Sequence, residues 1–205
     1  MSNIESLNRN FSSIGEELDA RVDQAKESGD QALAGTLEGV RYKITSLGLS
    51  AYGTKYVDES NGSHRVLGQF RPSNGEIGLA SYDVMENVGI RTGHTTEAVY
   101  GMVIEHELLH QQIHENEESH AIKVLLSQTF DADKVHMAEE GVVSYATSQA
   151  IDAYGQERAL VDEMAAKIGT TRGVFCRIIT HGEAGKLADL KAANDPSYDE
   201  VPKAA

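Results

Sequence analysis

The 205-residue sequence predicts an α+β fold, in which a small antiparallel or mixed sheet precedes a mainly helical half. Two changes along the chain support this. Between about Arg41 and Asp83, short runs of Tyr, Val, Ile and Thr alternate with glycine-containing turns, which is typical of short strands. From about Thr95 onward, the apolar spacing is helical almost to the end. Because strands and helices are segregated and do not alternate, α+β is favoured over α/β.

We expect three parts: a helical segment at 1–40, one domain at 41–193 and a flexible tail at 194–205. The first part carries a narrow apolar stripe at helical spacing, which either packs on the domain or serves as a partner-binding or pro-segment helix. The pair Ser28-Gly29 is expected to end this helix before a second, short one. The stripe consists of Ile4, Leu7, Phe11, Ile14, Leu18 and Val22.

The β-layer and the helical half follow from local patterns. Runs 64–70 and 76–81 flank the turn Pro72-Ser73-Asn74-Gly75 and predict a β-hairpin. Asp131 or Asp133 is expected to cap the helix that follows it. Helices are predicted at 95–116, 118–130, 134–154, 156–168 and 183–193, with a short apolar piece at 173–180.

The composition limits the partners and the compartment. Acidic residues outnumber basic ones by 32 to 18, and the resulting net charge of −14 argues against nucleic-acid or anionic membrane binding. The single cysteine, Cys176, excludes an internal disulfide and a cysteine-based metal site. We find no signal peptide and no membrane span, so a cytoplasmic protein is expected, with export by other routes left open. The oligomeric state is not indicated.

The most informative stretch is His106-Glu107-Leu-Leu-His110, which lies in the predicted helix 95–116. Two histidines four residues apart project from one side of a helix, separated by roughly 40°. Their imidazoles can therefore share one tetrahedral metal ion. Glu107 lies about 100° further around the helix, where a carboxylate can reach a water at the metal without binding the metal itself.

This His-Glu-x-x-His pattern resembles the zincin metallopeptidases over roughly residues 65–154. The resemblance implies a zincin-like fold, zinc as the cofactor, His106 and His110 as ligands and Glu107 as the general base. It also implies a strand beside the substrate cleft, which the hairpin at 69–80 would supply. The chain departs from the metzincin subclass, because Ile113 and Asn116 stand where that subclass has Gly and His.

The gluzincin subclass instead takes its third ligand from a glutamate on a later helix, and Glu139-Glu140-Gly141 resembles that segment. Helical periodicity places Glu139 in an apolar stripe, where a buried carboxylate needs a partner. The resemblance favours Glu140, because gluzincins of this pattern use the glutamate directly before the glycine. We favour Glu140 and keep Glu139 as the alternative. Gly141 is expected to let this helix approach the histidine helix closely.

The other candidates have weaker support. His114 is interpreted as a solvated histidine, with a supporting or substitute ligand role as the alternative. His120 and His136 are expected to be solvated or capping. Tyr145 is expected in the core and His181 without a site role, although some gluzincins use a tyrosine or histidine to stabilise the oxyanion.

The sequence thus predicts a zinc metallopeptidase that hydrolyses a peptide or protein substrate, held extended along a strand edge. The alternative is a non-catalytic zinc-binding structural or interaction protein, with His114 as the fourth ligand. A metal-dependent hydrolase acting on another bond is a third reading.

Overall fold

The computed structural model describes residues 11–57, 66–147, 154–183 and 185–187. It confirms the α+β class, since the described chain is mostly helical with a small three-stranded mixed sheet. The chain divides into two compact units, Met1–Leu108 and Leu109–Ala205. Helix α4 (Thr96–Glu115) begins in the first unit and ends in the second.

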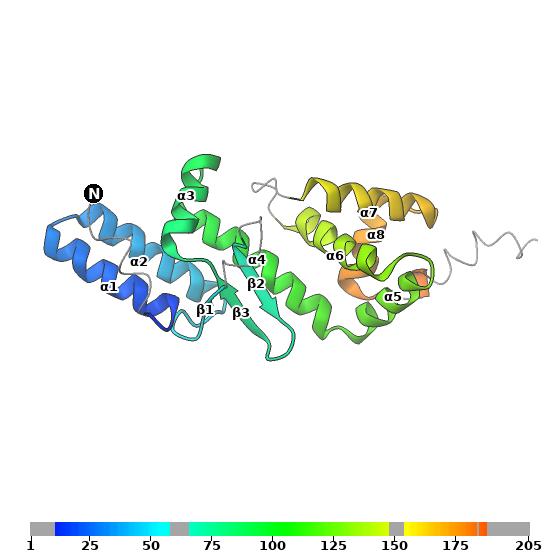
Figure 1. Cartoon of the computed structure of the whole chain (residues 1–205), viewed down its shortest axis with the longest axis horizontal. Helices are drawn as coiled ribbons and strands as arrows, with labels where there is room; N and C mark the ends of the chain where they lie inside the picture. Colours follow the sequence, from blue (N-terminus) through cyan, green and yellow to red (C-terminus); the bar gives the residue numbers. More distant parts are fainter. Residues whose placement is uncertain (1–10, 58–65, 148–153, 184, 188–205) are drawn as a thin grey trace, which may run out of the picture. The chain divides into compact units, whose positions relative to one another are not determined.

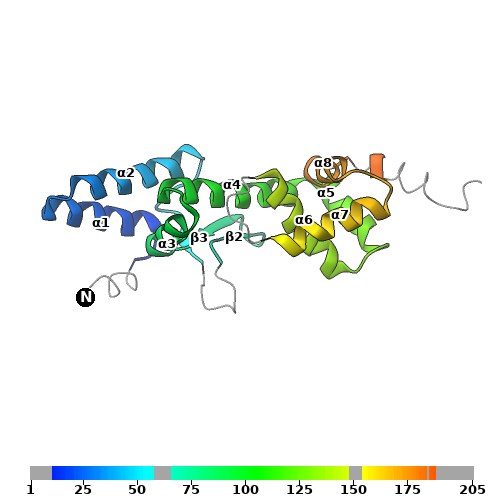
Figure 2. The same ribbon diagram turned by 90° about the horizontal axis from the view of Figure 1, so that it is seen from above.

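The first unit opens with a pair of helices, α1 (Ile14–Ser28) and α2 (Gln31–Ser46), which lie side by side (Figures 1 and 2). The predicted break at Ser28-Gly29 is confirmed, because Gly29 adopts a left-handed φ of 81° and ends α1. The expected strand texture from Arg41 is wrong at its start, and residue 40 falls inside α2. The apolar periodicity continues to Ile44, which is fully buried, so the helix persists. Ile4 and Leu7 lie outside the described residues.

The sheet has the order β1-β3-β2. Strand β1 (Lys55–Tyr56) runs parallel to β3 (Glu76–Leu79), and β2 (Gly68–Arg71) pairs with β3 antiparallel. The predicted hairpin is therefore confirmed, with shorter strands and Gly75 at a φ of 70° in its turn. Among the described strands, β2 is at an edge of the sheet.

Helix α3 (Tyr82–Thr92) follows β3 and was not expected from the sequence. Its apolar stripe is short, and the helix is terminated by Gly93, which adopts a left-handed φ of 74°. The first turns of α4 pack on the same unit, where the buried Tyr100 hydroxyl donates to the Ala80 carbonyl at 3.2 Å. The core of this unit includes Ile14, Leu18, Leu37, Val40, Ile44, Leu79, Met85, Val99, Tyr100 and Ile104.

The second unit is helical and contains α5 (Glu117–Ser127), α6 (Ala132–Ala146), α7 (Gly155–Lys167) and α8 (Arg172–His181). Helices α6 and α7 lie side by side (Figures 1 and 2). Asp131 caps α6 as expected, accepting from the Asp133 amide at 3.0 Å. The buried core of the unit includes Ile113, Ile122, Leu126, Val142, Val161, Met164, Phe175 and Ile178.

Three expectations for this half need correction or fall outside the structure. The helix predicted at 134–154 ends at Ala146, because Thr147 is extended with a ψ of 172°. The apolar piece at 173–180 is helix α8. The expected helix at 183–193 lies largely outside the described residues, as does the tail 194–205.

Gly141 has a different neighbour from the one expected. A Cβ atom at this position would lie 2.3 Å from the Glu157 carbonyl oxygen and 2.7 Å from Val161 Cγ2. The close approach of α6 is thus to α7, and the expectation that Gly141 serves contact with the histidine helix is wrong. Over the described part of the chain, no helix has the length and apolar character needed to cross a bilayer.

Candidate metal centre

The predicted motif helix at 95–116 is confirmed as α4, with bounds that differ by one residue at each end. His106, Glu107 and His110 are buried, with exposed fractions of 9%, 6% and 8%. Buried polar groups in a helix require partners, because water no longer solvates them. The two histidines are one turn apart on the same helix, as the four-residue spacing requires.

Glu140 on α6 supplies a carboxylate to this pair of histidines. Its Oε2 lies 3.3 Å from His110 Nε2. One ligand atom each from His106, His110 and Glu140 can be chosen so that all lie within 4.8 Å of one another. Bonds of about 2.0–2.1 Å to a tetrahedral zinc place neighbouring ligand atoms about 3.3–3.4 Å apart. The His110–Glu140 distance already matches this separation, and the donor set of two imidazoles and a carboxylate suits zinc.

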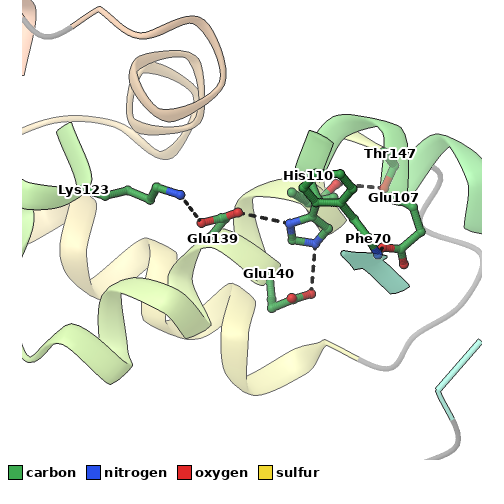
Figure 3. Close-up of polar contacts among 8 residues, drawn as sticks. Phe70, Glu107, His110, Lys123, Glu139, Glu140 and Thr147 are labelled. Carbon is green, nitrogen blue, oxygen red and sulfur yellow. Dashed lines mark hydrogen bonds and ion pairs between the residues drawn. The ribbon is translucent and has the colours of Figure 1, made fainter. Parts of the chain in front are cut away.

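Glu139 approaches the other nitrogen of the same ring. Its Oε1 lies 3.1 Å from His110 Nδ1, and its Oε2 accepts from Lys123 Nζ at 3.0 Å. Figure 3 shows Glu139 between Lys123 and His110, with Glu140 at the opposite nitrogen of the ring. Burial by itself raises the pKa of Glu139, but the hydrogen bond with His110 and the Lys123 charge outweigh it and hold the pKa below its ordinary value.

The two adjacent glutamates therefore occupy different positions on His110. Glu139 is the more buried, with 11% of its side chain exposed against 31% for Glu140. A carboxylate at Nδ1 fixes the ring orientation and leaves Nε2 available to a metal. The partner that the sequence analysis required for a buried Glu139 is thus provided by Lys123 and His110.

Glu107 has its own partner in the first unit. Its Oε2 accepts a hydrogen bond of 2.7 Å from the backbone amide of Phe70 on β2 (Figure 3). This places the carboxylate of the predicted base against the edge strand of the sheet. Glu107 is not one of the three clustered residues found in the described part of the chain.

The remaining candidates are not members of the cluster. Tyr145 hydrogen-bonds Asp162 and Arg172 at 3.2 and 3.1 Å, and the Arg158 and Arg172 guanidinium groups lie over its ring. Tyr145 is therefore engaged by α7 and α8 of the second unit. His114, His120, His136 and His181 are exposed and are not members of the cluster found among the described residues. Cys176 is half-buried in the second unit, and burial raises the pKa of its thiol to about 11.

Two contacts of this region were not found from the sequence. Lys123 is on a different helix from Glu139, and no local pattern links them. The Phe70 amide is a backbone group, which residue types do not reveal. Comparison of the chain with models of known protein families, with curated proteins and with solved structures gives no match.

Proposed function

We propose that this protein is a zinc-dependent peptide hydrolase of the zincin type, with His106, His110 and Glu140 as the zinc ligands. The observation that carries the proposal is the cluster of two buried imidazoles and one carboxylate, with ligand atoms within 4.8 Å. The order His-Glu-x-x-His followed by a later glutamate is the gluzincin pattern. Three protein ligands leave a fourth tetrahedral position open, as catalytic zinc sites require.

Zinc at such a site acts as a Lewis acid, which makes a water molecule acidic near neutral pH and polarises a carbonyl group. Two glutamates of the chain would act beside the metal. Glu107 accepts the proton of the attacking water at a carboxylate oxygen and passes it to the leaving amine. Glu139 holds the His110 ring by its Nδ1.

The substrate that suits this arrangement is a peptide in extended conformation. Strand β2 is at an edge of the described sheet, and its Phe70 amide contacts Glu107. Extended peptides add to sheet edges by pairing main chain with main chain. A peptide placed along β2 would therefore run close to the carboxylate of the base. Because the Phe70 amide donates to Glu107, the peptide would pair with other main-chain groups of the strand.

Metal analysis of the purified full-length chain tests the first half of the proposal. We expect about one zinc per chain, lost in His106→Ala and in His110→Ala. His120→Ala removes an exposed histidine outside the cluster and serves as the matched control, with zinc retained. Full zinc occupancy in either cluster variant would refute the site.

Incubation with a peptide library, read by mass spectrometry of new termini, tests the second half. We expect cleavage by the zinc-loaded parent and loss of most turnover in Glu107→Gln, which keeps its zinc and its fold. A zinc-loaded parent that cleaves no peptide would favour the structural or interaction role, or hydrolysis of another bond. Equal cleavage by Glu107→Gln would exclude Glu107 as the base.

A further inference from the structure

The edge of strand β2 presents backbone amides toward Glu107. In the antiparallel ladder, the Ala80 amide donates to the Leu67 carbonyl at 2.8 Å. Facing residues alternate between pairs that exchange hydrogen bonds and pairs that do not. The amides of Gln69 and Arg71 therefore point to β3, whereas those of Gly68 and Phe70 point away from it. The Phe70 N–H uses this outward direction to donate to Glu107 Oε2 at 2.7 Å.

Gly68 lies two residues earlier on the same strand and leaves room for the Glu107 side chain. A Cβ atom at position 68 would lie 2.7 Å from Glu107 Oε1 and 2.8 Å from Glu107 Cγ. It would also lie 2.5 Å from Val103 Cγ1. Real Cβ contacts are essentially never this short, so any other residue at position 68 requires the Val103 and Glu107 side chains, or the strand itself, to shift. Glycine weakens a strand by its conformational entropy, and this close approach explains its presence here.

We propose that β2 is the positioning element for Glu107, with the Phe70 amide fixing its carboxylate and Gly68 providing the space. This inference rests on the proposed function, in which Glu107 is the base. A backbone N–H in a strand has a fixed direction, because it has no side-chain rotamers. A carboxylate that accepts from it is therefore held in one orientation. Phe70 and Gly68 act through Glu107 and need not touch the substrate.

Amide hydrogen exchange, measured by NMR on the full-length chain, tests the contact without any need for activity. An outward amide on an edge strand exchanges quickly unless it has an acceptor. We expect the Phe70 amide to be protected in the parent and to exchange at least tenfold faster in Glu107→Ala. The Gln69 amide points into the ladder and is the internal reference, with protection unchanged.

Substitution at Gly68 tests whether this glycine provides the space for the Glu107 side chain. Gly68→Ala should raise the exchange rate of the Phe70 amide at least tenfold while the Gln69 amide stays protected. Val103→Ala is the matched control, because it removes the other side chain that contacts Gly68 and should leave the Phe70 amide protected. Exchange of the Phe70 amide at the parent rate in both Glu107→Ala and Gly68→Ala would overturn the proposal.

Kinetics on a cleaved peptide test the positioning role. Phe70→Pro removes the N–H at a site where the ladder does not use it, which an edge strand tolerates. We expect a tenfold to hundredfold fall in kcat, with KM changed less than threefold and zinc retained. A parent kcat in Phe70→Pro would overturn the proposal. If the parent cleaves no peptide, the proposed function fails, whereas the exchange measurements still decide whether β2 holds Glu107.

Discussion

Separate removal of the two adjacent glutamates tests how they divide their roles on His110. Glu140 Oε2 lies at Nε2 and belongs to the cluster with His106, whereas Glu139 Oε1 lies at Nδ1. Glu140→Ala should therefore remove a zinc ligand, and Glu139→Ala should remove only the partner of a ligand. Both variants lose one carboxylate from the same helix, so each is the matched control of the other.

The expected magnitudes follow from these positions. Structural zinc sites with four ligands bind with about 10–16 kcal/mol, or roughly 2.5–4 kcal/mol per ligand. Loss of Glu140 should thus weaken zinc binding by about a hundredfold to a thousandfold. Loss of a hydrogen-bond partner behind a ligand typically costs about 10–100-fold. Glu139→Gln keeps an oxygen that can accept from Nδ1, so its effect should be about tenfold or less.

The assay is competition for zinc with a chromophoric chelator at fixed pH, with circular dichroism as the check on folding. Glu140→Ala should raise the zinc dissociation constant at least about tenfold more than Glu139→Ala does. The reverse order would move the ligand one residue back, to Glu139. No effect from either variant would remove the downstream glutamate, and with it the gluzincin pattern, from the proposal.

Three further predictions concern the fold. Gly141→Ala should lower the free energy of unfolding by about 1–2 kcal/mol, because the added Cβ would lie 2.3 Å from a backbone oxygen of α7. Gly35→Ala, with no atom near the added Cβ, should instead stabilise α2. Urea denaturation measures both variants, and equal midpoints would contradict the packing at Gly141. Glu17→Ala should lower the free energy of unfolding by about 3 kcal/mol, because this carboxylate is fully buried in an ion pair, whereas the exposed Glu38→Ala should change it far less in the same urea denaturation. Burial raises the pKa of the Cys176 thiol from 9.0 to about 11. Alkylation of Cys176 at pH 8 should therefore be about a hundredfold slower in the folded protein than in the urea-unfolded chain, and should accelerate only toward pH 11. A fast reaction of the folded protein at pH 8 would refute this.

Much of the secondary structure was predictable, and the errors have local causes. The motif helix, the hairpin at Gly75 and the break at Gly29 follow from periodicity and from glycines that adopt positive φ. Helix α3 was missed because its stripe is short and lies between a strand and a turn. The extension of α2 past Arg41 was missed because its residues Tyr42 and Ile44 also suit strands.

The sequence by itself determined that His106 and His110 lie on the same side of one helix, because residues four apart are separated by only about 40° around the helix axis. It also placed Glu107 off the face of the two histidines. It left Glu139 and Glu140 as alternatives, since adjacent residues differ by only about 100° in direction. Only the tertiary structure decided which carboxylate approaches Nε2, because that depends on how α6 packs through Gly141 against α7 and on the Lys123 charge beside Glu139.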